Sequence, residues 1–205
     1  MSIRNRLISI VSLFLISMLL LVPADASDSL SVVVRSFQEN EELINDLDPE
    51  ISVQDIHFDN GEIPADLSSI IWICFKGSHL FSGFNSRSQG VFLVLPCATG
   101  RREGQKTKVG DMRTPEGAFR VQQIQDASFW QPYVDKKTGD TIGYGPYFIR
   151  IDTGNWKGIG IHGTDENHEH EIGTNASHGC IRLKNDDLLK VKELSRVGQK
   201  ILILP

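Results

Sequence analysis

Short apolar runs separated by turn-forming residues recur along the chain from residue 69 onward. Residues 70–75 and 80–84 flank Lys76-Gly77-Ser78-His79, a pattern typical of a β-hairpin. Further strands are predicted over residues 90–97, 118–124, 147–151, 158–161 and 201–204. A short helix is predicted over 188–197, with Asn185-Asp186-Asp187 as its N-cap and acidic first turn and Gly198 at its end. This order predicts a β-rich α+β domain, a mixed sandwich or barrel with a late short helix.

The first 26 residues have the three parts of a secretory signal peptide. Arg4 and Arg6 precede an apolar run over residues 7–22, and Ala24-Asp25-Ala26 has the small-x-small form of a cleavage site. We expect cleavage after Ala26 and export to the periplasm or cell envelope. The alternative is an uncleaved anchor, which the short apolar run disfavours. No later segment is apolar enough to span a bilayer, so we expect no stable membrane span after cleavage.

The remaining chain divides into two parts. Residues 27–68 form an acidic N-terminal extension with a partial helical stripe over 30–47, and Asp48-Pro49 ends that stripe. Residues 69–205 form one domain with a substantial core. The formal net charge of the chain is −5, and no basic arm or stripe is present. This charge pattern argues against binding to nucleic acid.

The three cysteines differ in their surroundings. Cys74 and Cys97 lie in apolar runs, so we expect both thiols to be buried, and they can either pair or stay free. Cys180 lies in a polar segment, two residues after His178. An odd number of cysteines in an exported protein leaves at least one thiol free or in an intermolecular bond.

Cys180 has the neighbours that a nucleophilic cysteine needs. His162 and His178 are two candidate bases, and the residues alone do not choose between them. Gly179 permits a tight turn, which would let the amides of Gly179 and Cys180 face a developing oxyanion. Arg182 follows on the same face of an extended segment and can bind a carboxylate, although an ordinary surface salt bridge is the alternative.

These residues carry a resemblance to a known family. His162-Gly163-Thr164, a gap of fourteen residues and then Ser177-His178-Gly179-Cys180 resemble the signature of the L,D-transpeptidase catalytic domain, or YkuD domain. Thr114-Pro115-Glu116-Gly117 and Thr99-Gly100 agree more loosely with that family. The resemblance covers residues 69–205 and implies an L,D-transpeptidase-like fold. Cys97 departs from the family pattern, which has no thiol there.

The resemblance also implies a reaction. Family members cut the bond between a diamino acid and D-Ala in peptidoglycan stem peptides, and then form a 3→3 cross-link or hydrolyse the acyl-enzyme. Cys180 would attack the diamino acid carbonyl, and His162 would be the base, oriented by the carbonyl of Gly163. His178 would shape the oxyanion site or the thiolate's surroundings. No metal or organic cofactor is implied.

The substrate side of the site is assigned to Gly163, Ser177, Arg182 and Tyr144. Residues 129–145 mix aromatic and turn residues, which predicts a flap over the site, and Tyr144 belongs to this segment. For Tyr144 and Trp130, ordinary packing is the alternative to lining the site.

Three other functions stay open at this point. A hydrolytic L,D-carboxypeptidase or endopeptidase would use the same cysteine site. A zinc peptidase would need ligands from His168-x-His170, His162, His178 and Cys180, but their spacing matches no closed ligand set. A non-catalytic wall-binding module would not need the reactive cysteine and histidines that the chain carries.

Overall fold

A computed structural model describes residues 24–59, 61–135, 139 and 141–205. Residues 1–23, which hold most of the predicted signal peptide, lie outside this range. The predicted cleavage position, after Ala26, falls within helix α2 (Ala24–Glu39). Within the described part of the chain, no helix combines the length and the apolar character that crossing a membrane requires.

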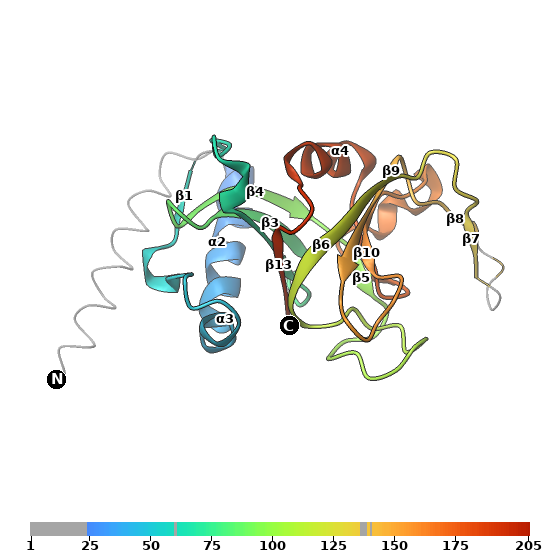
Figure 1. The fold of residues 1–205 in the computed structure, drawn as a ribbon, viewed down its shortest axis with the longest axis horizontal. Helices are drawn as coiled ribbons and strands as arrows, with labels where there is room; N and C mark the ends of the chain where they lie inside the picture. Colours follow the sequence, from blue (N-terminus) through green and yellow to red (C-terminus); the bar gives the residue numbers. More distant parts are fainter. Residues whose placement is uncertain (1–23, 60, 136–138, 140) are drawn as a thin grey trace.

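The described chain is organised around one mixed sheet of nine strands (Figure 1). In spatial order these are β1 (His57–Phe58), β4 (Gly90–Pro96), β3 (Leu80–Asn85), β2 (Ile70–Phe75), β13 (Lys200–Leu204), β6 (Gly117–Asp126), β9 (Tyr147–Asp152), β10 (Gly160–His162) and β12 (Ile181–Arg182). Two smaller sheets pair β5 (Thr99–Gly100) with β11 (Asn175–Ser177) and β7 (Tyr133–Val134) with β8 (Thr141–Ile142). The predicted hairpin is confirmed, since β2 and β3 pair antiparallel.

The last strand lies in the middle of the sheet. Strand β13 runs parallel to β2, with Ile73 opposite Leu202, and antiparallel to β6, with Ala118 opposite Leu202. All six residues of β2 are buried, because both faces of this part of the sheet are covered. An apolar run without alternation is the sequence that such a doubly covered strand requires.

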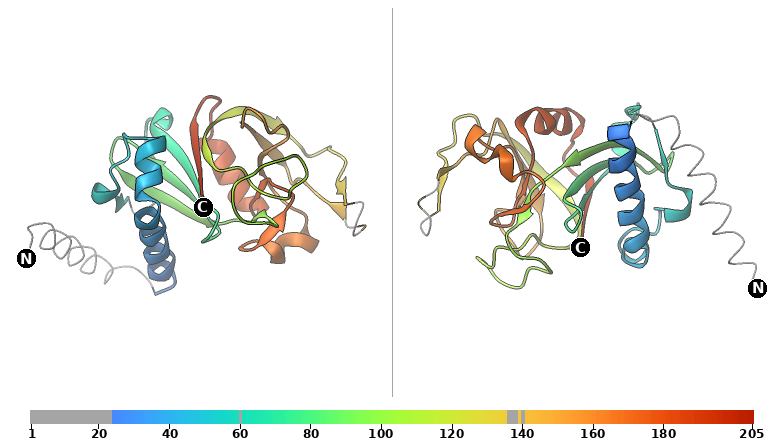
Figure 2. Two further views of the ribbon diagram at one scale, coloured as in Figure 1. Left: turned by 90° about the horizontal axis from the view of Figure 1, so that it is seen from below. Right: turned by 180° about the vertical axis from the view of Figure 1, so that it is seen from behind.

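Two cores lie on opposite faces of β2 and β13, because successive residues of a strand point to opposite sides. On one face α2 and α3 (Glu41–Leu47) pack Phe37 and Ile44 against Ile73 and Leu202. The other face contains Trp72 and the interior side of α4 (Asn185–Leu194). Figures 1 and 2 show α2 and α3 together on one side of the sheet and α4 on the other. Short 3-10 helices occupy Val53–Asp55, Leu67–Ser69 and Glu166–Glu171.

The late helix is confirmed, but its start and end differ from the prediction. Its N-cap residue is Lys184, and Asn185 does not cap it, because the Asn185 Oδ1 accepts the amide of Thr164 at 3.1 Å. The acidic first turn is confirmed in Asp186 and Asp187. The helix ends at Leu194, before the predicted residue 197. Its N-terminus is therefore bound to the segment that follows β10.

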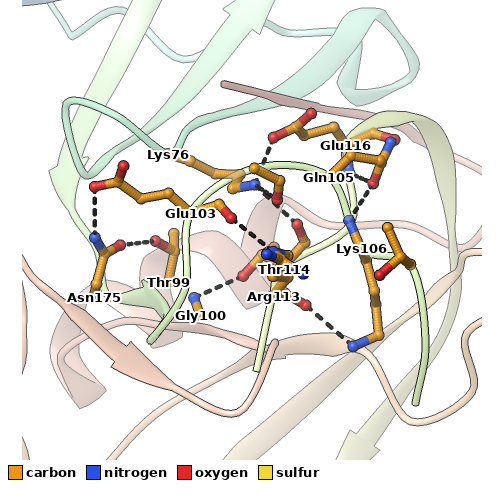
Figure 3. Close-up of polar contacts among 12 residues, drawn as sticks. Lys76, Thr99, Gly100, Glu103, Gln105, Lys106, Arg113, Thr114, Glu116 and Asn175 are labelled. Carbon is orange, nitrogen blue, oxygen red and sulfur yellow. Dashed lines mark hydrogen bonds and ion pairs between the residues drawn. The ribbon is translucent and has the colours of Figure 1, made fainter. Parts of the chain in front are cut away.

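Lys76, the residue after β2, holds the loop between β5 and β6 in place (Figure 3). The Lys76 Nζ donates to Glu116 Oε1 at 2.6 Å, to the carbonyl of Gly104 at 2.7 Å and to that of Thr114 at 3.0 Å. All three N–H groups of this ammonium group therefore have an acceptor. These contacts replace the water that the buried charge has lost. The loop is thereby held at one edge of the pocket described next.

Candidate active site

The parallel pairing of β10 and β12 brings the two halves of the sequence signature together. Ile161 lies opposite Ile181 and His162 lies opposite Arg182, so Cys180 lies beside Gly160. Residues in register on paired strands point to the same face of a sheet. His162, Cys180 and Arg182 accordingly line one pocket of about 480 Å³.

The imidazole of His162 is buried and fixed in orientation. It stacks on Phe148, with ring centroids 5.6 Å apart, and meets the edge of Tyr144 at 5.2 Å. Its Nδ1 lies 2.6 Å from the carbonyl oxygen of Gly163, so Nδ1 carries the proton and Nε2 is the basic nitrogen. Burial, and then the charge of Arg182, lower the pKa of His162 to about 3, against the Gly163 carbonyl, which raises it. The ring is therefore a neutral base at neutral pH.

The thiol of Cys180 is partly buried and donates to the carbonyl of Gly158 at 3.4 Å. Burial raises its pKa above the usual value, while the backbone N–H of Gly160 and the cations Arg182, Arg150 and Lys106 act in the opposite direction. A charged histidine beside the thiol would lower this pKa. The buried His162 is neutral and supplies no such charge, so the resting pair is a thiol and a neutral imidazole.

The Ser177-His178-Gly179-Cys180 turn is closed by the Ser177 hydroxyl. Its Oγ donates to the carbonyl of Cys180 at 2.5 Å and accepts the amide of Gly179 at 3.0 Å. Gly179 has a φ of +131°, and a Cβ there would lie 2.9 Å from the carbonyl oxygen of Arg113, so only glycine fits. A role of the Gly179 amide toward an oxyanion stays a prediction, and in the structure this amide donates to Ser177 Oγ. The Cys180 amide has no hydrogen-bond partner among the described residues.

His178 points to the β7–β8 hairpin. Its Nε2 lies 2.9 Å from Asp135 Oδ2, which also accepts from Arg101 Nη1 at 3.0 Å. The His178 ring packs on Tyr133, with centroids 5.0 Å apart. Asp135 was not predicted from the sequence, because nothing in the residues around it indicates a contact with His178, 43 positions later in the chain. The predicted flap thus includes a hairpin that is tied to the signature turn.

Arg182 is not a surface residue. Only 1% of it is exposed, so the surface salt-bridge alternative is wrong. Its Nη1 lies 2.8 Å from Glu171 Oε2, but the orientation leaves Nη1 and Nη2 without a hydrogen bond to the described residues. Gly163 and Tyr144, the other residues predicted on the substrate side, are joined by a backbone hydrogen bond. The Gly163 amide donates to the Tyr144 carbonyl at 2.9 Å. Tyr144 also lines the pocket.

Comparison with known proteins agrees with this geometry. The sequence model of the L,D-transpeptidase catalytic domain, YkuD, matches residues 82–203. The chain belongs to the YkuD family. Its sequence is 30% identical over 149 residues to YqjB of Bacillus subtilis (strain 168), whose name places it among the L,D-transpeptidases. This match covers 70% of the chain and 75% of YqjB.

The fold of the chain resembles that of a solved L,D-transpeptidase. L,D-transpeptidase 3 from Mycobacterium tuberculosis, in complex with a faropenem-derived adduct, is 18% identical with a TM-score of 0.50. The match covers 67% of this chain and 60% of that one. An L,D-transpeptidase from Mycobacterium smegmatis is 21% identical with a TM-score of 0.47, over 67% and 59% of the two chains. The YkuD chain described here spans about three fifths of the length of these structures.

The two other cysteines of this YkuD protein are buried and free. The thiol of Cys74 hydrogen-bonds that of Cys97, and this contact and burial raise the pKa of Cys97 well above its usual value. The two thiols are thus neighbours without a disulfide bond. Both belong to the core on the Trp72 face of the sheet, and neither lines the pocket.

The alternative zinc ligands do not gather. Over the ranges that the structure describes, no group of three or more His, Cys, Asp or Glu side chains is placed to hold a metal ion. His168 instead lies with its Nδ1 2.7 Å from Asp165 Oδ1, and His162 and His178 face different partners. The zinc-peptidase alternative therefore has no ligand set in this part of the chain.

Proposed function

We propose that this protein is an exported, cysteine-dependent L,D-transpeptidase of peptidoglycan. The observation that carries the proposal is that His162 and Cys180 line one pocket while the carbonyl of Gly163 holds His162 Nδ1. This leaves the basic Nε2 for the thiol proton. Residues 1–26 would be the signal peptide, 27–68 an extension and 69–205 the catalytic domain.

The reaction begins with a neutral thiol. The Cys180 sulfur attacks the carbonyl of the diamino acid as its proton passes to His162 Nε2. The amide C–N bond then breaks, and the imidazolium returns the proton to the leaving amine of D-Ala. The Cys180 amide is the available backbone donor for the negative oxygen that forms during attack.

The acyl-enzyme is resolved by an amine of a second stem. That amine attacks the thioester, gives its proton to His162 and forms the 3→3 amide link, and the Cys180 thiol regains a proton. Membership of the YkuD family supports peptidoglycan as the substrate. Hydrolysis differs only in having water as the attacking group.

Intact mass spectrometry of residues 27–205 with a purified tetrapeptide stem tests this function. We expect a mass increase that is absent in Cys180→Ala, together with released D-Ala, and a cross-linked dimer when a second stem is added. Released D-Ala without a dimer would make the protein a carboxypeptidase. No adduct and no D-Ala, with the protein folded and the thiol reduced, would contradict the proposal.

Two reagents separate the remaining classes of function. Iodoacetamide should stop a thiol enzyme, and a chelator should leave it untouched, whereas a zinc peptidase should show the reverse. A wall-binding module should sediment with peptidoglycan whether or not iodoacetamide or a chelator is present.

A further inference from the structure

A row of three residues crosses three neighbouring chain segments, and the two residues at its ends, Arg150 and Cys180, line the pocket. Arg150 on β9 lies opposite Gly160 on β10, and Gly160 lies beside Cys180. Gly160 carries no side chain, and the Phe148 ring takes up the space beside it, 2.3 Å from where a Cβ would lie. Neighbouring strands are about 4.8 Å apart, so the Cα atoms of Arg150 and Cys180 are separated by about 10 Å. An arginine side chain can span much of that distance.

The guanidinium of Arg150 is anchored but not neutralised. Its Nε and Nη2 donate to Gln125 Oε1 at 3.1 and 3.0 Å, and its Cζ lies 5.1 Å from the centroid of Phe148. Within the described ranges Arg150 has no carboxylate partner. Gln125 fixes the planar group with a neutral oxygen, so the positive charge is oriented and uncompensated.

The other buried cations of the pocket have carboxylate neighbours. Lys106 Nζ lies 2.7 Å from Asp111 Oδ1, and Arg182 Nη1 lies 2.8 Å from Glu171 Oε2. Arg150 differs from both. It is also only half-buried, so a ligand in the pocket can reach it.

The described residues that line the pocket include four cations and no Asp or Glu. The cations are Lys106, Arg150, Lys157 and Arg182. Such a pocket favours a ligand with negative charge, and an arginine fork suits a carboxylate. Of these four cations, Arg150 is the one that is held in place, has no carboxylate partner and lies in register with Cys180.

We propose that Arg150 binds a carboxylate of the donor stem peptide and makes the enzyme select stems in which that carboxyl group is free. This inference rests on the proposed function and names its substrate class. Two carboxylates of a tetrapeptide stem lie within reach of the reacting carbonyl: the distal carboxyl group of the diamino acid and the C-terminal carboxyl group of D-Ala. Both present the same chemistry to the guanidinium.

The test compares four synthetic donors in which each of these carboxyl groups is either free or a carboxamide. The value of kcat/KM for release of D-Ala or D-alaninamide is measured with the wild type, Arg150→Gln, Arg150→Lys and Arg120→Gln. Arg120 is an exposed arginine on β6 outside the pocket lining, so its variant is the matched control.

We expect the wild type to prefer the free acid at one of the two positions by about 10- to 100-fold, the range for a charge-assisted hydrogen bond. Arg150→Gln should bring this ratio close to one, Arg150→Lys should restore part of it, and Arg120→Gln should leave it unchanged. A general loss of packing would lower all four rates together and leave the ratio intact. The position at which the preference disappears identifies the carboxylate.

Binding to Cys180→Ala separates failure of this inference from failure of the proposed function. Free-acid and amidated donors are titrated by calorimetry against Cys180→Ala, with and without Arg150→Gln. The selectivity for the free acid should persist in the single variant and disappear in the double variant, even if no donor acylates the wild type. The inference is overturned if the wild-type pocket does not distinguish acid from amide, or if Arg150→Gln keeps the preference.

Discussion

His162 donates its Nδ1 proton to the carbonyl oxygen of Gly163, its own neighbour in the chain, across 2.6 Å. His178 instead directs its Nε2 to Asp135, 2.9 Å away on the β7–β8 hairpin. The first contact leaves a basic nitrogen for the pocket, and the second ties the turn to the hairpin. The two histidines of the signature therefore have different surroundings and different expected roles.

The acylation rate should depend more on His162 than on His178. We expect His162→Ala to lower the rate of adduct formation at Cys180 by about 10²–10⁴-fold, the usual contribution of a general base. His178→Ala should cost less, because its ring orients the turn and the hairpin. Stopped-flow acylation, with thermal unfolding as the control for folding, measures both. A larger loss in His178→Ala would exchange the two roles.

The free energy of unfolding should decrease as the pH is lowered, over a range set by the pKa of His162. Its pKa drops from the ordinary 6.5 to about 3 on folding, so below about pH 6.5 the unfolded chain takes up a proton that the folded chain does not. The stabilisation is complete above pH 6.5 and is lost as the pH falls towards 3, at most about 5 kcal/mol.

Urea unfolding from pH 7 to pH 4.5 measures this linkage. The matched variant is His162→Asn, which does not titrate in this range and keeps a donor for the Gly163 carbonyl. We expect the wild type to lose about 2–3 kcal/mol more than His162→Asn over this interval. Parallel pH profiles for the two proteins would show that His162 titrates normally.

Ser177 should be replaceable by threonine and not by alanine. Its Oγ joins the Gly179 amide to the Cys180 carbonyl inside the turn, and the residue is buried. Ser177→Ala leaves both groups without this partner and should cost about 1–3 kcal/mol of unfolding free energy, with a lower acylation rate. Ser177→Thr keeps the oxygen and should stay near the wild type. Equal losses in both variants would show that the hydroxyl has no such role.

The parts of the fold that are local in sequence could be predicted, and the non-local ones could not. The hairpin of β2 and β3 follows from two apolar runs around one turn, and the family follows from the His162 and Ser177–Cys180 spacing. The central position of β13 depends on pairing with β2, more than 120 residues earlier in the chain. The predicted N-cap of α4 was wrong because the Asn185 side chain accepts the Thr164 amide, a contact that exists only in the folded protein.

The site shows the same division. The signature names Cys180 and His162, but it does not show that Ser177 occupies the Gly179 amide. It also does not point to Asp135, which meets His178 from 43 positions away in the chain, or to Arg150, which lies opposite Gly160 only once β9 and β10 pair. The direction of the Cys180 pKa depends on burial, which a motif does not contain.

Native alkylation should modify one cysteine. Cys74 and Cys97 are fully buried in the core, and burial together with their mutual contact raises the pKa of Cys97. Cys180 is partly exposed in the pocket. We expect one iodoacetamide adduct per native chain, absent in Cys180→Ala, and three after unfolding in guanidinium. A second adduct on the native protein would contradict the buried positions of Cys74 and Cys97.

The pH dependence of that alkylation distinguishes a thiol from a preformed thiolate at Cys180. Only the thiolate reacts, and burial raises the pKa of Cys180 above its usual value of about 8.5. The rate constant should therefore increase about tenfold per pH unit from pH 6 to pH 8, without a plateau, as expected below the pKa of a single thiol. His162→Asn should leave this slope unchanged, because the neutral imidazole does not supply the charge that would lower the pKa. A plateau below pH 8 that disappears in His162→Asn would establish a thiolate–imidazolium pair and require the first proton transfer to precede substrate binding.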